Sequence, residues 1–544
     1  MLPPQSSWFA LTLWMLIAVG CQEVPAQDSG GTLPPEQAAY DVTFYDLSVG
    51  VHPADQTIDG TLTVVADVTD SLDVFVLNLD RRLSVSRVWP RGKPSRSLAV
   101  ERRAGDNELW IALPTPKGPG DRVALTVAYD GTPRVAPNPP WDGGVTWATT
   151  PSGAPWIATS CQTAGADLWW PVKDHPSDEP DSMNVALTVP DTLVAASNGR
   201  LRTVERASDS TKTFRWGIST PINTYAVSMN VAPYAVVDTT YQSTAGKAVP
   251  VSFYALPEDT ANARAHLPQF LEHVRFLEET LGPYPFRADK YGIAQTPFLG
   301  MEHQTLIAYG NNFRDGGLGY DAGFDALHFH ELAHEWYGNC LTVRDWKDFW
   351  LHEGTATYLE ALYAESLRGT AAYHEVVDHF RHQIANRTPI ARKRPATAQQ
   401  MYTRDVYYKG ALFLHTLRSM MGEEAVKTLL RRFVVSAESP SSCRHVDTES
   451  FLSLAESIAG RSLDGVAETY LYQASLPRID TTRTQTQLRL KWEGTAGPGF
   501  DVPVPVRVGQ ERRVVRMEGG SGTLAVPAEA EVRIDPENWV MKAN

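Results

Sequence analysis

The hydrophobic periodicity changes twice along the chain, and these changes constrain its fold more than any other feature. Between residues 40 and 238, short alternating runs are bounded by Gly, Pro, Asp and Asn, which is the pattern of β-strands. From residue 257 apolar side chains recur at helical spacing, first over residues 261–281 before Gly282. Alternation returns near residue 479 and continues to the end. The pattern predicts a multidomain α+β fold.

The chain length supports this division, because a single hydrophobic core stops growing beyond about 250–300 residues and the chain has 544. We predict a β-rich N-terminal domain over residues 39–240. A mostly helical domain is expected over residues 241–478, and a small β-sandwich module over residues 479–544. Within the first domain we expect a strand over residues 225–231 and a long loop, which is either a plain surface loop or a lip over a cleft, over residues 132–156.

The first residues have the pattern of an export signal. The apolar run over residues 8–20 is about as long as the core of a signal peptide and is too short to cross a bilayer comfortably. It ends at Ala18-Val19-Gly20-Cys21, which resembles the bacterial lipoprotein box, in which the Cys is lipidated after cleavage. Residues 22–38 are polar and rich in Pro and Gly, as in a flexible linker. We expect residues 1–21 to be removed as a signal peptide, and the exported protein to be a membrane-anchored bacterial lipoprotein, periplasmic or on the cell surface.

The net charge limits the classes of partner. The formal charge is −14 at pH 7 and the sequence pI is about 5.5. Nucleic acids and anionic membrane faces attract basic patches, so we expect no nucleic-acid partner. Cys161, Cys340 and Cys443 are widely spaced and form no CxxC pair, which argues against a cysteine metal site. These three cysteines allow at most one disulfide, whose pairing is left open, and the alternative is that they are buried free thiols.

The chemistry of the chain is concentrated in His330-Glu331-Leu332-Ala333-His334, which lies in a helical stretch expected over residues 322–339. Residues four apart share one face of a helix, so both imidazoles can reach one metal ion with Glu331 beside them. Nineteen residues after His334, Glu353 begins a second helical pattern and can supply a third ligand. Two His and one Glu leave one tetrahedral position for water, as in catalytic zinc sites.

Other polar residues near this motif allow more than one interpretation. His328 lies two residues from His330, on the opposite side of a helix, and is interpreted as a packing residue. His352 either lines the site or packs against it. Asp345 and Asp348 can either hydrogen-bond a ligand imidazole or lie at the surface.

Several further segments extend the pattern beyond one motif. They are Leu299-Gly300-Met301-Glu302-His303, Glu335-Trp336-Tyr337-Gly338-Asn339, Trp350-Leu351-His352-Glu353-Gly354 and Tyr407-Tyr408-Lys409-Gly410. Together with the metal motif they resemble the aminopeptidase N family of zinc metallopeptidases, the gluzincins, which also contains the leukotriene epoxide hydrolase. The resemblance extends over roughly residues 40–475 and implies a thermolysin-like catalytic domain.

The resemblance implies roles for individual residues. One zinc ion would be bound by His330, His334 and Glu353. Glu331 would act as the general base, and Tyr407 would donate a hydrogen bond to the tetrahedral oxyanion. A neutral phenol is a donor at working pH, and donors aimed at developing charge stabilise the transition state. Tyr408 is the adjacent candidate, but it does not match the Tyr-x-Lys-Gly spacing.

The same resemblance implies a substrate site for peptides with a free N-terminus. Glu302 would bind the α-ammonium group, Gln162 would help to hold it, and Gly300 and Met301 would line the same edge. Leu299 and His303 stand where the family carries Gly and Asn, so contacts along this edge can differ. Larger members continue into a helical domain that covers the cleft, so we expect a more open site that accepts longer peptides.

These expectations favour a zinc-dependent aminopeptidase that attacks peptides with a metal-activated water. The alternatives are a thermolysin-type endopeptidase, which would not need Glu302, and a non-catalytic zinc-binding scaffold of the same fold. The scaffold is disfavoured because Glu331 and Tyr407 are both present, although zinc binding requires neither. Epoxide hydrolysis uses the same metal and is a further alternative.

Overall fold

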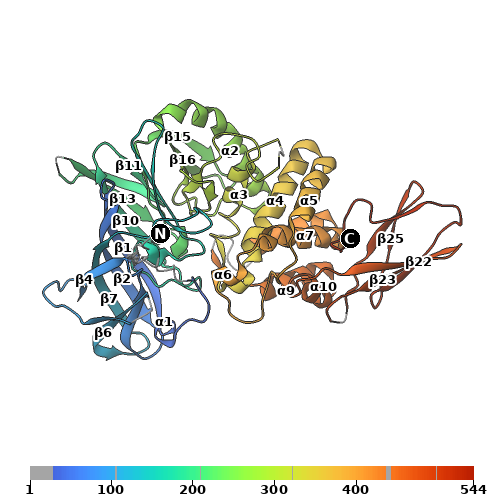
Figure 1. Ribbon diagram of the computed structural model, residues 1–544, viewed down its shortest axis with the longest axis horizontal. Coiled ribbons are helices and arrows are strands. Elements are labelled where there is room, and N and C mark those ends of the chain that lie inside the picture. The colour runs from blue at the N-terminus through green and yellow to red at the C-terminus, as the bar shows by residue number, and fades with distance from the viewer. Residues whose placement is uncertain are drawn as a thin grey trace, which may run out of the picture.

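A computed structural model describes residues 28–103, 107–208, 210–320, 323–435, 443–497 and 499–543. Figure 1 shows a β-rich N-terminal part, a helical middle part and a C-terminal pair of small sheets, arranged in chain order along the longest axis. The predicted signal peptide and Cys21 lie outside the described residues. No helix of the described ranges is long and apolar enough to cross a membrane.

The N-terminal part is built on a seven-stranded sheet, in which β1 pairs parallel with β10 and antiparallel with β2. Its strands, in spatial order, are β12 (Arg200–Arg206), β13 (Thr211–Ile218), β10 (Ser182–Pro190), β1 (Tyr40–His52), β2 (Thr57–Val68), β7 (Arg122–Gly131) and β4 (Leu83–Pro90). A three-stranded sheet adds β3 (Leu72–Asn78), β6 (Glu108–Lys117) and β5 (Val100–Arg102). Alternate residues of β1 are buried, as the period-two pattern predicts.

A four-stranded sheet is formed by strands that alternate along the chain with those of the seven-stranded sheet. Its order is β11 (Val194–Ala196), β14 (Asn230–Ala232), β9 (Pro155–Ser160) and β8 (Gly144–Thr149). The loop expected over residues 132–156 is therefore partly wrong, because β8 lies inside it and pairs with β9. The strand expected over residues 225–231 is also largely wrong. Tyr225 belongs to the 3-10 turn Thr224–Ala226, and only the end of that range enters β14.

The predicted flexible linker needs a correction where it is described. The backbone oxygen of Ser29 accepts a hydrogen bond from Ala398 N at 2.9 Å, and Gly30 forms a bridge with Thr397. The short helix α1 (Pro35–Ala38) then leads directly into β1. Residues 28–38 are thus packed onto the fold rather than free, because their backbone groups find partners in the helical part.

A five-stranded mixed sheet begins the middle part and supplies one wall of the site. Its order is β15 (Ala235–Gln242), β16 (Ala248–Ala255), β17 (Tyr291–Gln295), β19 (Ile307–Tyr309) and β18 (Gly300–Met301). The predicted domain boundary at residue 240 falls inside β15. The two-residue strand β18 lies at the edge of the sheet, next to the helix that carries His330.

The helices pack beside this sheet, and α2 ends where Gly282 has a φ of 115°. They are α2 (Thr260–Leu281), α3 (Ala326–Ala333), α4 (Trp350–Arg368), α5 (Thr370–Gln383), α6 (Ala398–Met401), α7 (Arg404–Met421), α8 (Glu423–Val434), α9 (Thr448–Ala459) and α10 (Asp464–Tyr470). Helix α3 is shorter than the 322–339 stretch expected from its pattern. The Asp325 side chain caps it by accepting from His328 N, and the chain turns immediately after His334.

Helices α4 and α7 cross at two glycines. A Cβ added to Gly410 would lie 2.8 Å from Gly354 Cα, and a Cβ added to Gly354 would lie 2.7 Å from Gly410 Cα. Only hydrogen at both positions allows so close an approach. Gly354 follows Glu353 on α4, and Tyr407 lies on α7 one turn before Gly410. This crossing therefore fixes the relative position of two predicted site residues.

The C-terminal module consists of two three-stranded sheets. They are formed by β22 (Arg478–Arg483), β23 (Gln487–Glu493) and β26 (Ser521–Ala525), and by β25 (Glu511–Val515), β24 (Val504–Val508) and β27 (Val532–Ile534). The remaining strands β20 (Leu341–Val343) and β21 (Arg444–Val446) pair with each other in the middle part. Leu488, Leu490 and Trp492 alternate inward along β23 and form part of the module's core.

We predict that Gly410→Ala destabilises the protein, although Ala is the better helix former. The added methyl group would overlap the α4 backbone, and overpacking of this kind costs about 1–3 kcal/mol. Gly118→Ala is the matched control, because a Cβ at that position meets nothing within 4 Å. Thermal unfolding of both variants checks this; equal midpoints would contradict the account of the crossing.

Candidate active site

The predicted metal ligands converge in the structure. His330 and His334 project from the end of α3, and Glu353 projects from the first turn of α4. The two Nε2 atoms lie 3.1 Å apart, and each lies 3.4 Å from Glu353 Oε2. Ligand atoms about 2.0–2.1 Å from a tetrahedral zinc ion stand about 3.3–3.4 Å from one another. The three atoms therefore fit three corners of a zinc tetrahedron.

A second layer of hydrogen bonds orients both imidazoles. His330 Nδ1 lies 2.7 Å from Glu360 Oε1, and His334 Nδ1 lies 2.9 Å from Tyr337 O. Each Nδ1–H donates to its oxygen acceptor, which leaves each Nε2 lone pair facing the centre. Glu360 was not predicted from the sequence. It lies seven residues after Glu353, two helical turns along the same face, and that spacing could have identified it.

The charges around these residues favour a cation at the centre. Burial lowers the pKa of His330, but the carboxylates of Glu353 and Glu360 outweigh burial and raise it well above its ordinary value. Burial raises the pKa of Glu353, but His334 and His330 lower it further, to well below its usual range. Glu353 Oε2 is buried and forms no hydrogen bond with any described residue. The donor set fits zinc, with a position left for a further ligand.

Glu331 lies beside the metal ligands, where the sequence predicts the general base. It is buried, and burial raises its pKa to about 8. Gly300 of β18 makes room for it, because a Cβ on that glycine would lie 2.5 Å from Glu331 Oε1. Glu331 Oε1 thus lies directly against the Gly300 backbone, and a carboxylate oxygen of Glu331 lies within 4.8 Å of a His334 ring nitrogen. A carboxylate with a raised pKa next to the metal can accept and release a proton near neutral pH.

Tyr407 and Tyr402 form a pair of phenols at the same centre. The Tyr407 hydroxyl donates to Tyr402 Oη at 3.0 Å, and its ring stacks on His330 with 6.0 Å between centroids. Burial, followed by the charge of Glu353, raises the pKa of Tyr407 well above its ordinary value, so the hydroxyl stays a donor. Tyr402 was not predicted. Tyr408 also lines the cavity, but its ring packs on Phe380.

The predicted amine-binding residues come together from two domains. Gln162 Nε2 donates to Glu302 Oε1 and, at 3.1 Å, to Glu353 Oε1. The Tyr225 hydroxyl, which sequence analysis missed, donates to Glu302 Oε1 at 3.1 Å. Burial raises the pKa of Glu302 to about 7. Ligand atoms of Glu302, Glu331 and His334 lie within 4.8 Å of one another, so this carboxylate borders the reaction centre.

The two departures from the family pattern lie along β18. Leu299 lines the cavity, and its backbone oxygen accepts from Gly310 N at 2.7 Å. His303 is fully buried, and neither ring nitrogen has a hydrogen-bond partner among the described residues. Burial lowers the pKa of His303 to about 3, so the ring is neutral. The Leu299 side chain thus faces the substrate cavity directly, whereas His303 packs behind it.

The residues whose roles were left open are placed by the structure. The His328 ring stacks on Phe270 with 3.6 Å between centroids, so it packs as expected. His352 accepts from Val343 N and is not among the metal ligands. Asp345 caps a 3-10 turn, and Asp348 accepts from Thr448, so neither binds a ligand imidazole. Glu360 takes that role instead.

A cavity of about 520 Å³ holds these groups together. Gln162, Gly300, Met301 and Glu302 line it with the metal ligands, Glu331 and Tyr407. Trp141, which is 48% exposed, lines its rim. Every predicted catalytic, metal-binding and substrate-binding residue therefore borders one space.

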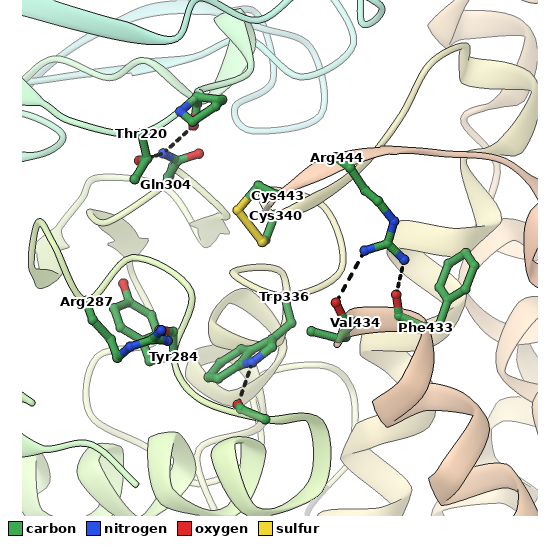
Figure 2. Close-up of a disulfide and its surroundings, with 12 residues drawn as sticks. Thr220, Tyr284, Arg287, Gln304, Trp336, Cys340, Phe433, Val434, Cys443 and Arg444 are labelled. Atoms are coloured by element: carbon green, nitrogen blue, oxygen red, sulfur yellow. Dashed lines mark hydrogen bonds between the residues drawn. A yellow bond between two sulfur atoms is a disulfide. The ribbon is translucent and has the colours of Figure 1, made fainter. Parts of the chain in front are cut away.

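A disulfide joins Cys340 to Cys443 and ties the segment after the metal helix to β21 (Figure 2). In the same region Trp336 Nε1 donates to Gly282 O at 3.0 Å, and Arg444 donates to the backbone oxygens of Phe433 and Val434. Asn339, next to Cys340, donates to Glu302 O at 2.9 Å. The bonded segment thus supports the backbone of Glu302, the carboxylate predicted to bind the amine. Cys161 is buried and free.

Comparison with protein families gives two matches. Residues 42–226 match a model described as the peptidase M1 N-terminal domain, and residues 272–470 match one described as the peptidase family M1 domain. Endoplasmic reticulum aminopeptidase 1 of Homo sapiens is 24% identical over 71% of this chain and 42% of its own length. That of Mus musculus is 26% identical over 50% of this chain and 30% of its own length. The chain spans less than half the length of these curated relatives.

Solved structures match over more of their length. An M1 zinc metallopeptidase from Deinococcus radiodurans superposes with a TM-score of 0.66 and 26% identity, over 81% of this chain and 95% of that one. A mutant of the same metallopeptidase, bound to a Tyr-Ser-Ala substrate, superposes with the same TM-score and 25% identity, also over 81% and 95%. The fold and the metal centre are thus shared with zinc metallopeptidases.

We predict that Glu360→Gln weakens zinc binding about 10- to 100-fold, because the neutral amide no longer holds the His330 imidazole as a strong acceptor. Competition with a chromogenic chelator measures the affinity. Glu375→Gln, an exposed change on α5, is the control and should bind zinc as the wild type does. Equal affinity in all three proteins would show that Glu360 does not support the ligand.

Proposed function

The chain belongs to peptidase family M1, and from this premise we propose that it is a zinc-dependent aminopeptidase that removes N-terminal residues from peptides. The observation that carries the proposal is the buried pair of Gln162 and Glu302 beside the metal ligands. A buried carboxylate at this position complements an α-ammonium group. A zinc endopeptidase has no use for it, since its substrates present no charge there.

When bound, zinc supplies a Lewis acid that polarises a water molecule and the scissile carbonyl. The protein positions His330, His334 and Glu353 to hold the ion. Glu331, beside these residues, accepts a proton from the attacking water and passes it to the leaving amine. Gly300 keeps the space in front of this carboxylate open.

Tyr407 stabilises the charge that develops on the substrate oxygen. Its hydroxyl is neutral at working pH and lies on the cavity wall beside the His330 ring. A donor aimed at a developing oxyanion contributes about 3 kcal/mol to the lowering of the barrier. Tyr402 accepts from this hydroxyl in the protein alone, and so holds the phenol in place before the substrate arrives.

Glu302 determines where the peptide is cut. Gln162 and Tyr225 both donate to its Oε1, which fixes the carboxylate at the end of the cavity. An α-ammonium bound there places the first peptide bond, and no later one, next to the metal ligands. The edge strand β18 offers backbone groups of Gly300 and Met301 along the same path. The comparison proteins named as aminopeptidases, and the structure with a Tyr-Ser-Ala substrate, support this choice.

We predict that the protein hydrolyses aminoacyl-arylamides in a chelator-sensitive way and leaves their N-acetylated counterparts intact. Glu302→Ala should lower kcat/KM for free-amine substrates by at least about 100-fold, because a buried charge-assisted contact worth about 3 kcal/mol is lost. Steady-state kinetics measure this in wild type and variant. Glu375→Ala is the control, an exposed carboxylate of the same domain.

Each rival activity gives a different result in this assay. Equal cleavage of acetylated peptides would indicate a thermolysin-type endopeptidase. Stoichiometric zinc with no turnover of any peptide would indicate a scaffold. Hydrolysis of epoxides with no cleavage of peptides would identify the third alternative.

We also infer that the protein is exported and anchored by a lipid on Cys21. The apolar run before Cys21 and its small-residue flank support this. The Cys340–Cys443 disulfide supports export independently, because such bonds persist in oxidising compartments and are rare in the cytosol. The site would then face peptides outside the cytoplasm.

The lipid anchor is tested with Cys21→Ser in a bacterial host that processes lipoproteins. We expect the wild type in the membrane fraction, with an N-terminal peptide at Cys21 whose mass includes acyl chains. The variant should lose the acyl mass and leave the membrane. Wild-type protein in the soluble fraction with an unmodified Cys21 would contradict the anchor.

A further inference from the structure

Among the described residues that line the catalytic cavity, Arg404 is the single Lys or Arg. The same cavity is lined by four carboxylates, those of Glu302, Glu331, Glu353 and Glu360. Three of these already have close partners. Glu302 accepts from Gln162 and Tyr225, Glu353 accepts from Gln162, and Glu360 contacts His330 and Tyr320.

Arg404 is exposed and has no hydrogen bond or ion pair to any residue of the described ranges. Surface arginines commonly form such pairs, and this protein has several, such as Arg122 with Asp67. An arginine has five donors in a planar fork that matches a carboxylate. An exposed, unpaired fork on the wall of a substrate cavity is therefore available to the substrate.

Two further polar residues line the cavity beside it. Thr403 Oγ1 is buried without a partner in the described ranges, and Gln383 is the last residue of α5. The Asp405 carboxylate accepts from Ala385 N at 2.6 Å, which brings the end of α5 to the start of α7. Gln383, Thr403 and Arg404 thus form one corner, called here the α5–α7 corner.

The corner also lies at the N-terminus of an 18-residue helix, α7, whose free backbone N–H groups favour negative charge. Glu302, at the amine end of the cavity, favours positive charge. Arg404 and Tyr407 are three positions apart on α7, so they share one face of the helix. The axial rise between them is about 4.5 Å. A peptide extends by about 3.3–3.6 Å per residue. The corner therefore lies within the length of one or two extended substrate residues from the substrate carbonyl that Tyr407 would contact.

We propose that the α5–α7 corner, through Arg404, binds a carboxylate of the peptide substrate close to the scissile bond. This inference rests on the proposed aminopeptidase activity and adds a preference to it. The carboxylate is either the C-terminus of a di- or tripeptide or an acidic side chain in a longer one. In both cases the substrate presents opposite charges to the two ends of the cavity.

The test compares pairs of peptides that differ only by this charge. For X, the N-terminal residue best cleaved as an arylamide, the pairs are X-Ala against X-Ala-NH2, X-Ala-Ala against X-Ala-Ala-NH2, and X-Glu-Ala-NH2 against X-Gln-Ala-NH2. We expect kcat/KM of the wild type to favour the charged member of at least one pair about tenfold, with the preference falling as salt is raised. The first two pairs identify the C-terminus, and the third an acidic side chain.

Arg404→Gln should bring that ratio to about one, and Arg404→Lys should keep part of it. Arg387→Gln, an exposed arginine in the loop after α5, is the matched control and should keep the wild-type ratio. A ratio that is unchanged in Arg404→Gln, or is one in the wild type for all pairs, would overturn the proposal.

A binding measurement separates this proposal from the proposed activity. Calorimetric titration of zinc-loaded Glu331→Gln compares the affinity for X-Ala-Ala, X-Ala-Ala-NH2, X-Glu-Ala-NH2 and X-Gln-Ala-NH2 without turnover. If the charged peptide binds more tightly to Glu331→Gln, and the double variant Glu331→Gln/Arg404→Gln loses this difference, the proposed carboxylate site is supported even if no peptide is hydrolysed. Equal affinity within both pairs contradicts it, even if the aminopeptidase activity is established by the arylamide assay.

Discussion

The structure depends on four carboxylates held together in a buried cavity. Glu302, Glu331, Glu353 and Glu360 line one space with two imidazoles, and desolvated like charges repel one another. The arrangement is stable when positive charge is placed among them. In the proposed function a zinc ion supplies it at the ligands, and the α-ammonium of a peptide supplies it at Glu302. Metal binding and substrate recognition therefore follow from the same electrostatic constraint, and each carboxylate acquires its role from its nearest partner.

The fold serves this constraint by bringing together segments far apart in the chain. Gln162 reaches the cavity from the β-rich part, the edge strand β18 brings Glu302, and α7 brings Tyr407. The crossing of α4 and α7 at two glycines and the disulfide after α3 hold these elements in fixed relative positions. Small changes in packing at these points are expected to reach the site, because no single element carries it.

Much of the site could be predicted from the sequence because the predicted metal ligands lie close together in the chain. The two histidines of α3 are four residues apart, and Glu353 begins the next helix. Glu360 was missed although its helical spacing gave a signal. Tyr225 could not be found, since it reaches Glu302 across 77 residues through domain packing that no local pattern encodes. The same holds for β8, in which polar and apolar residues alternate only weakly. Its pairing with β9 depends on the tertiary structure rather than on a local pattern.

The central claim is that Glu302 binds the free N-terminus and so places only the first peptide bond at the metal ligands. One residue is then removed at a time. Mass spectrometry of a single unblocked decapeptide during digestion by the zinc-loaded protein tests it most directly. The account predicts a ladder of products shortened one residue at a time from the N-terminus, with free amino acids accumulating. Internal fragments that appear before the ladder would contradict it and would assign the zinc centre to an endopeptidase.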